Sequence, residues 1–105
     1  MINIEVYKTE NGQIFGFKAK NHGKSVVCSA VSALTINAAN SIEKFADCEM
    51  VCEYEPKGGF LHLEIPDIKS GKGNEKAELL LNSLMLGLMS VKSEYGNQIK
   101  LSEVQ

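Results

Sequence analysis

The fold is organised around the stretch NHGKSVVCSAVSAL, residues 21–34, in which a short turn leads into a helix. Ser25 is typical of a helix N-cap, because its hydroxyl can accept a hydrogen bond from a backbone N–H two or three residues later. Val26, Val27 and Cys28 would then be the first three helical residues. The Cys28 thiol would lie among unpaired backbone donors, which together with the helix dipole favour a thiolate.

His22 lies six positions before Cys28 and could accept the thiol proton or pair with the thiolate. This interpretation predicts a nucleophile at neutral pH. A purely structural interpretation fits the same residues, since a cysteine near a helix start commonly serves as a small apolar core residue and a histidine in a turn as polar surface. Sequence spacing alone favours the structural interpretation, because proximity of Cys and His in sequence is weak evidence for a catalytic pair.

Toward the N-terminus, two stretches predict a β-hairpin. Residues 2–8 alternate apolar and polar side chains, as a half-buried strand does. Asn11 and Gly12 favour a tight turn. Residues 13–20 predict the returning strand, with Phe15, Phe17 and Ala19 on one face.

Toward the C-terminus, three-four spacing of apolar residues predicts one helix that reaches Phe45. Its expected core stripe is Val27, Val31, Leu34, Ala38, Ile42 and Phe45. Cys28 lies beside the centre of this stripe, on the side that carries Ser32. A small, partly polar flank next to a thiol could admit a peptide backbone. Close packing of a helix on a sheet also prefers small residues, so both interpretations of Ser32 stay open.

The second half of the chain repeats the pattern of a hairpin followed by a helix. Residues 48–55 and 60–65 alternate around a turn at 56–59 and predict two strands. Cys48, Met50, Cys52 and Tyr54 would share one face of the first strand. Leu61, Leu63 and Ile65 would point inward from the second strand, with Phe60, His62 and Glu64 on its other face.

A polar loop is expected over residues 66–73, followed by a helix that Asn74 caps and Gly96 ends. The expected apolar stripe of this helix is Ala77, Leu81, Leu84, Leu88, Val91 and Tyr95, widened by Leu80, Met85 and Met89. A short strand at 98–101 closes the chain, and residues 102–105 are expected to fray.

The order β-β-α-β-β-α-β predicts a single α+β domain over residues 1–105. It would have two layers, with the helices packed on one face of a mostly antiparallel or mixed sheet. The sheet face away from the helices would carry the row Cys48, Met50, Cys52 and Tyr54, or the residues that alternate with them. This face would be apolar enough to favour a homodimer.

Composition narrows the classes of partner and cofactor. The chain has 105 residues, 44% hydrophobic and 23% charged, with a net charge of −2, so nothing in it favours nucleic acid or a membrane surface as a partner. The three cysteines are an odd number and lack the spacing of a disulfide framework, which is typical of a reducing compartment. We therefore expect a cytoplasmic protein. Cys48 and Cys52 would lie about 13 Å apart along a strand, too far to share one zinc ion. Gly71-Lys72-Gly73 lacks the spacing of a phosphate-binding loop, and no metal or cofactor is expected.

The block CSAVSAL at residues 28–34, with Asn21-His22-Gly23 before it, resembles the ribosomal-processing cysteine protease family Prp. The likeness continues through Gly58-Gly59, the helix from Asn74 to Tyr95 and the closing strand, and so covers nearly the whole chain. It implies an α+β fold, a homodimer and a cysteine endopeptidase. The implied reaction is removal of the N-terminal extension of large-subunit ribosomal protein twenty-seven during ribosome assembly. By position, His22 would be the general base and Cys28 the nucleophile.

The sequence departs from the family pattern beside this pair. Only residues 23–27 separate His22 from Cys28, where family members carry a longer loop thought to help enclose the substrate. Ser25 stands where the family usually has Asp, which keeps the cap and removes a charge, and Asn21 replaces a glycine. A second hypothesis follows, that the chain is a catalytically impaired Prp-like binding or assembly factor for a ribosomal protein.

The expected mechanism is that of a Cys–His dyad. A thiolate at Cys28 would attack a peptide carbonyl, and the oxyanion would be met by backbone N–H groups at the helix start, including that of Cys28 itself. No third catalytic residue is evident. His62 or Glu64 would take that role only if the fold brought them near.

Overall fold

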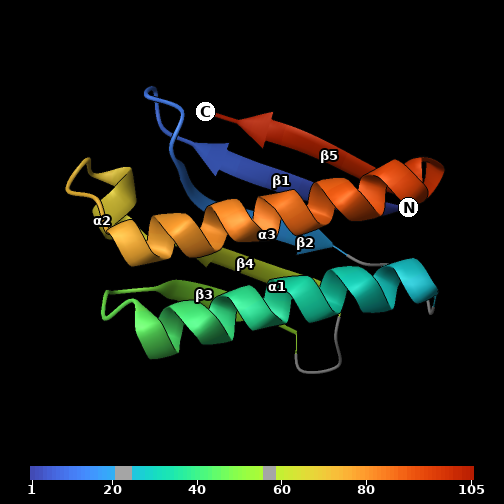
Figure 1. Cartoon of the computed structure of the whole chain (residues 1–105), viewed down its shortest axis with the longest axis horizontal. Helices are drawn as coiled ribbons and strands as arrows, with labels where there is room; N and C mark the ends of the chain where they lie inside the picture. The colour runs from blue at the N-terminus through green and yellow to red at the C-terminus, as the bar shows by residue number, and fades with distance from the viewer. Residues whose placement is uncertain (21–24, 56–58) are drawn as a thin grey trace.

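The computed structural model describes residues 1–20, 25–55 and 59–105 (Figure 1). Its element order confirms the predicted β-β-α-β-β-α-β pattern and adds two single turns of helix. The elements are β1 (Ile2–Lys8), β2 (Ile14–Lys20), α1 (Val26–Phe45), β3 (Val51–Tyr54), β4 (Phe60–Glu64), α2 (Pro66–Lys69), α3 (Glu75–Glu94), the 3₁₀ turn η1 (Gly96–Gln98) and β5 (Ile99–Val104). None of the helices in the described ranges is long and apolar enough to cross a membrane.

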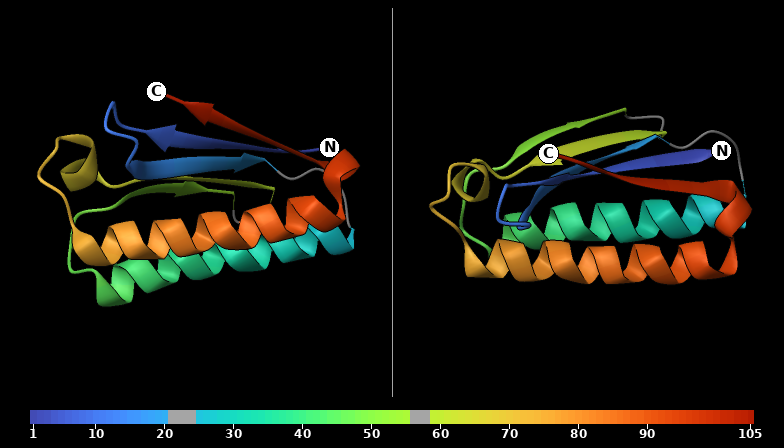
Figure 2. Two further views of the ribbon diagram at one scale, coloured as in Figure 1. Left: turned by 45° about the horizontal axis from the view of Figure 1, so that its top comes forward. Right: turned by 90° about the horizontal axis from the view of Figure 1, so that it is seen from above.

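The five strands form one mixed sheet in the order β3-β4-β2-β1-β5. All neighbouring pairs are antiparallel except β1 and β5, which run parallel with Ile4 opposite Leu101. The long helices α1 and α3 run antiparallel to each other on one face of this sheet, which makes the two layers seen in Figure 2. The predicted α+β class and the mixed sheet are confirmed.

The core lies between the helix pair and the sheet. Ile4, Phe17 and Leu63 from three neighbouring strands are 0–1% exposed, and they face Ile42 of α1 and Leu88 of α3 in one buried cluster. Close packing brings α1 and α3 together at Gly87, where an added Cβ would lie 3.1 Å from the Leu34 side chain.

Both helices depart from the predicted core stripes at their exposed edges. Phe45 was expected inside, but it is 56% exposed, and the C-cap residue Ala46 is buried instead. Met89 is 55% exposed and does not widen the α3 stripe. α3 ends at Glu94 with Tyr95 as its C-cap residue, so the helix stops directly before Gly96 as predicted.

A bulge in the first hairpin changes the predicted face of Phe15. The register shifts between Tyr7 and Lys8, where Lys8 pairs with Ile14 and Tyr7 with Gly16. This shift turns Ile14 into the core and sets Phe15 on the other face, where its ring stacks on Tyr7 at 5.8 Å. The prediction that Phe15 shares a face with Phe17 was therefore wrong.

Three predicted boundaries also change. β3 begins at Val51, so the strand expected from residue 48 is shorter. Part of the expected loop at 66–73 is the turn α2, which begins at Pro66 and is anchored by Ile68 at 0% exposure. β5 extends to Val104 because the parallel ladder to β1 continues past the point where fraying was expected.

The row Met50, Cys52 and Tyr54 faces α1, not the open side of the sheet. Cys52 pairs with the buried Leu63, which places both residues on the helix side. The open face carries Tyr7, Lys18, His62 and Glu64, a mixture of aromatic and charged groups, so the predicted apolar open face was wrong.

Candidate active site

The helix start at Ser25 is formed as the sequence predicts. Ser25 has extended backbone angles, and its Oγ accepts a hydrogen bond of 3.1 Å from the backbone N–H of Cys28. The Ser25 carbonyl accepts the next bond, 3.1 Å from the N–H of Ser29. α1 therefore begins at Val26 with Cys28 in its first turn, which confirms the predicted cap.

Cys28 lies at the edge of the core, near the positive end of α1. It is 7% exposed and belongs to the buried hydrophobic cluster. The first turn of α1 carries no acidic residue, so no carboxylate of that turn opposes the helix dipole. The position suits a thiolate nucleophile as well as a small core side chain.

The oxyanion donors expected at this helix start need one correction. The Cys28 N–H is occupied by the Ser25 hydroxyl. Because the first backbone bond of the helix runs from Ser29 to Ser25, the N–H groups of Val26 and Val27 precede the intrahelical ladder. Among the described residues, these two groups, not the N–H of Cys28, are the donors left for an oxyanion.

The chain has two histidines that could act with Cys28, His22 and His62. His62 lies on the open face of the sheet, where its Nε2 is 2.9 Å from Glu64 Oε2 and its ring lies 5.6 Å from that of Tyr7. Cys28 packs on the helix side, so the sheet separates it from both His62 and Glu64. His22 belongs to residues 21–24, outside the described residues, and its pairing with Cys28 stays a prediction.

A groove of about 500 Å³ runs beside α1, between that helix and the β3–β4 edge of the sheet. We call it the α1–β3 groove. Its walls come from α1, β2, β3 and β4, and its lining residues are Ala19, Ser32, Thr35, Ile36, Ala39, Asn40, Glu43, Met50, Cys52, Tyr54, Glu55, Gly59, Phe60 and Leu61. Ser32, predicted to flank the thiol, is half-buried and lies one helical turn after Cys28 at this groove.

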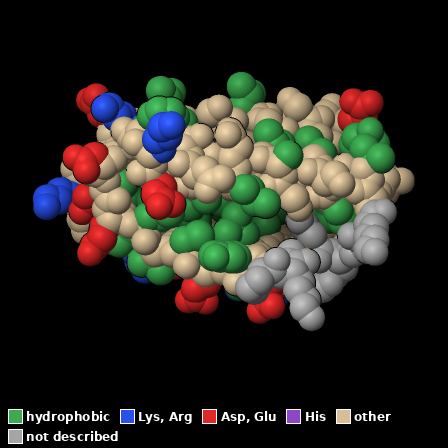
Figure 3. Space-filling view, turned by 90° about the horizontal axis from the view of Figure 1, so that it is seen from below, with side chains coloured by type: hydrophobic (Ala, Val, Ile, Leu, Met, Phe, Trp, Pro, Cys, Tyr) green, Lys and Arg blue, Asp and Glu red, His purple; other side chains and the backbone are tan. Residues whose placement is uncertain are grey.

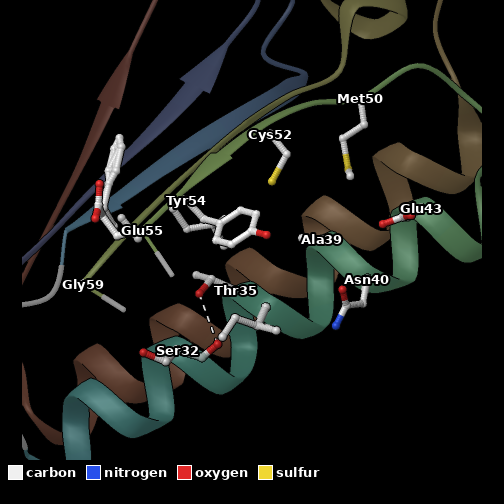
Figure 4. Close-up of a pocket in the computed structure, with 14 residues that line it drawn as sticks. Ser32, Thr35, Ala39, Asn40, Glu43, Met50, Cys52, Tyr54, Glu55 and Gly59 are labelled. Atoms are coloured by element: carbon white, nitrogen blue, oxygen red, sulfur yellow. Dashed lines mark hydrogen bonds between the residues drawn. The ribbon is translucent and has the colours of Figure 1, made fainter. Parts of the chain in front are cut away.

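The floor of the α1–β3 groove is apolar and rich in sulfur. Figure 4 shows the Met50 and Cys52 side chains pointing toward α1, with the Tyr54 ring reaching across in the same direction. Burial, and secondarily the negative charge of Glu43, raises the pKa of the Cys52 thiol. Cys52 therefore stays protonated at neutral pH and adds to the apolar floor.

Cys48 lies outside this groove and packs against the core. Its pKa is raised by burial and by the carboxylates of Asp67 and Asp47. Within the described ranges, no three His, Cys, Asp or Glu side chains gather as metal ligands would.

The α1–β3 groove is the feature that sequence reasoning missed. The alternation of Met50, Cys52 and Tyr54 was visible, and so was the small side of α1 at Ser32 and Ala39. Only the register of β3 on β4 shows that these two rows face each other across a gap.

Comparison with known proteins agrees with the fold and the resemblance. The chain is 22% identical to the ribosomal processing cysteine protease Prp of Bacillus subtilis over 97% of this chain and 96% of that protein. It is 23% identical to the protein of the same name from Staphylococcus aureus strain Mu50, over 97% of this chain and 98% of that one.

Solved structures share the architecture. The crystal structure of an essential ribosomal processing protease Prp from S. aureus with a covalently linked product peptide matches with a TM-score of 0.88 at 23% identity, over 99% of this chain and 100% of that one. The same protease with a substrate peptide matches with a TM-score of 0.87 at 22% identity, over 99% of this chain and 100% of that one. The family model for cysteine protease Prp matches residues 1–100, and the chain therefore belongs to the cysteine protease Prp family.

Proposed function

We propose that this chain is a cysteine endopeptidase in which Cys28 is the nucleophile and His22 the general base. The observation that carries the proposal is the position of Cys28 in the capped first turn of α1, one turn before a groove that can hold a peptide. His62 lies across the sheet, which leaves His22 as the histidine for this role. We propose that residues 1–105 form a single domain that carries this site.

The reaction proceeds through an acyl-enzyme. The Cys28 thiol gives its proton to His22, and its sulfur attacks the peptide carbonyl carbon. The carbonyl oxygen becomes an oxyanion near the N–H groups of Val26 and Val27. When the tetrahedral intermediate collapses, the C–N bond breaks and His22 returns the proton to the leaving amine. Water then hydrolyses the thioester and restores the thiol.

The proposed substrate is a ribosomal protein with an N-terminal extension, specifically large-subunit ribosomal protein twenty-seven. Support comes from family membership and from the names of the relatives, which are ribosomal processing proteases. The three cysteines, none in a disulfide, suit the cytoplasm, where this substrate is made.

A homodimer is proposed on the surface of α3. Leu79 and Leu86 are 69% and 70% exposed, and Met89 beside them is 55% exposed. These apolar side chains share the outer side of one helix, as interface residues do. Sedimentation of the wild type should give twice the mass of one chain. The Leu86→Glu variant should give the mass of a single chain. A wild-type monomer at micromolar concentration would refute this part.

The peptidase is tested by intact mass spectrometry of the extended ribosomal protein after incubation with wild type, Cys28→Ala and Cys48→Ala. Cys48 is a matched control because it is also a cysteine outside any disulfide and lies away from the groove. Loss of the extension with wild type and Cys48→Ala, and not with Cys28→Ala, is expected. Binding without cleavage by folded wild type would instead identify a non-catalytic assembly factor, the alternative suggested by the short 23–27 segment.

A further inference from the structure

We propose that the Asn11-Gly12 pair in the β1–β2 turn, residues 9–13, is a site of spontaneous covalent modification, where Asn11 loses ammonia and becomes isoaspartate or aspartate. The isoaspartate form would release this turn from the start of α3. Neither Cys28 nor the peptidase reaction takes part, so this site and the proposed function can fail separately.

The modification consumes water and needs no enzyme or oxidant. The backbone nitrogen of Gly12 gives its proton to solvent and attacks Cγ of Asn11, and the side-chain nitrogen leaves as ammonia. Water then opens the cyclic imide at one of its two carbonyl carbons. Opening at Cγ gives aspartate. Opening at the main-chain carbonyl carbon gives isoaspartate, whose main chain runs through Cβ and Cγ and is therefore one carbon longer.

The surroundings of Asn11 suit this reaction. Asn11 is the only asparagine of the chain that precedes a glycine, and a glycine has no Cβ to hinder the attacking nitrogen. A Cβ built at Gly12 would meet nothing within 4 Å, so neighbouring atoms leave space around this amide. Asn11 is exposed, and within the described ranges no hydrogen bond holds its side chain. The amide of Asn74, in contrast, is held at 3.0 Å by the Ala46 carbonyl and at 2.9 Å by the Ala77 N–H.

The folded turn slows the reaction. The Gly12 N–H donates a hydrogen bond of 2.9 Å to the Thr9 carbonyl, so the attacking nitrogen holds its proton inside the turn. Gln13 closes the same turn, because its N–H donates to the Thr9 hydroxyl at 3.2 Å and its carbonyl accepts from the Thr9 N–H at 2.9 Å. Attack on Asn11 requires the Gly12 bond to open. Loss of one hydrogen bond of ordinary strength changes such an opening equilibrium by about two- to tenfold.

The β1–β2 turn is tied to α3 through one carboxylate. Nε2 of Gln13 donates a hydrogen bond of 2.8 Å to Oε1 of Glu78. Oε2 of Glu78 accepts the Asn74 N–H at 2.9 Å and so belongs to the cap of α3. The turn and the start of α3 lie at the same end of the molecule (Figure 1). The geometry of the turn therefore decides whether Gln13 reaches the helix.

Isoaspartate at position 11 would break this connection. The extra main-chain carbon lies two residues before Gln13, so it displaces the side chain that reaches Glu78. The new carboxylate also changes the net charge of the chain from −2 to −3, directly after Glu10 and close to Glu78. Figure 3 shows that charged side chains already gather at this end, where α1 ends and α3 begins. Added length and added repulsion act in the same direction.

Ageing of the folded wild type at about 37 °C and about pH 8, followed by peptide mapping, tests the site. In water enriched with heavy oxygen, the carboxylate formed at position 11 should carry the label. A protein isoaspartate methyltransferase should methylate the isoaspartate fraction. Asn11→Gln is the matched control, since its longer side chain does not close the same ring. Thr9→Val removes the hydroxyl that accepts the Gln13 N–H, and it is compared with wild type at a temperature at which both are folded.

Asn11 should be converted before the exposed Asn40, which precedes a serine, and Asn11→Gln should stay unmodified. Thr9→Val should speed the conversion by about two- to tenfold, and unfolding in urea should speed it at least as much. Conversion of Asn11 no faster than that of Asn40 would overturn the site. Equal rates in wild type, Thr9→Val and urea would overturn the protection by the turn.

Melting temperatures test the release of the turn from α3. The isoaspartate form is separated from the aged sample by ion exchange, because it carries an additional negative charge. It should melt about 4 °C below the unmodified protein, and Gln13→Ala, which removes the same hydrogen bond, should melt lower by a similar amount. Freshly prepared Asn11→Asp, which adds the charge without the extra carbon, should melt between them and wild type. An isoaspartate form that melts with wild type would overturn the release.

Discussion

The hydroxyl of Ser25 accepts a hydrogen bond of 3.1 Å from the backbone N–H of Cys28. One contact therefore both begins α1 and holds the proposed nucleophile in its first turn. It also takes the Cys28 N–H out of the set of oxyanion donors. The stability of the helix start and the chemistry of the thiol are linked at this residue.

Ser25→Ala should lower the free energy of unfolding by about 1 kcal/mol, the usual value of an N-cap side chain. Chemical denaturation measures the change. Ser25→Asn should restore most of the loss because its side-chain carbonyl can accept the same bond. Ser29→Ala, one turn into the helix and exposed, is the control and should be close to neutral. If Ser25→Ala left the free energy of unfolding unchanged, the cap would contribute nothing to stability in solution.

Alkylation should distinguish the three thiols. Iodoacetamide at about pH 6, followed by peptide mapping, should modify Cys28 first, as expected of the proposed nucleophile. Cys48 and Cys52 should react slowly, since burial and nearby carboxylates raise the pKa of each thiol. If Cys28 reacted no faster than Cys52, the structural interpretation of Cys28 would be the correct one.

The same raised pKa values predict lower stability at alkaline pH. The pKa values of folded Cys48 and Cys52 lie above the ordinary thiol value of about 9, near which the unfolded thiols lose their protons. Their contribution to stability is thus fully present below about pH 9 and is lost as the pH rises through the folded values. Each thiol adds a slope of at most about 1.4 kcal/mol per pH unit. The double variant Cys48→Ser, Cys52→Ser should show a flatter decline of the unfolding free energy between about pH 8 and pH 10, and an unchanged slope would contradict the assignment.

Two neighbouring positions on α1 should differ sharply in their contribution to the core. Ile42 is 0% exposed, so Ile42→Ala should cost about 2–5 kcal/mol. Phe45, although larger, is 56% exposed, and Phe45→Ala should cost less than about 1 kcal/mol. Thermal or urea unfolding measures both. Equal losses would show that Phe45 is covered in solution, for instance by a second copy of the chain.

Gly16 should resist substitution because of its contact with β4. A Cβ at this position would overlap the carbonyl oxygen of Leu63, a backbone atom that cannot move aside cheaply. Gly16→Ala should destabilise the protein by more than about 1 kcal/mol. Gly96→Ala is the matched control, since a Cβ there meets nothing within 4 Å. Wild-type stability of Gly16→Ala would require the β2–β4 ladder to shift.

Local signals in the sequence determined most of the secondary structure. Ser25 and Asn74 carry side chains that cap a helix by themselves, and each cap is formed where it was predicted. The alternation of apolar and polar residues predicted β1 and β4, because every second residue of a half-buried strand points into the core. The block around Cys28 was enough to indicate the family.

The tertiary structure decided what depends on distant residues. The bulge opposite Tyr7 turned Phe15 outward, and pairing with β1 extended β5, since each strand takes its register from a neighbour far away in the chain. The sheet separated His62 from Cys28, and the approach of β3 to α1 created the groove that ends at Glu43. These features arise from contacts between residues that are far apart in the chain, and a short stretch of sequence does not reveal such contacts.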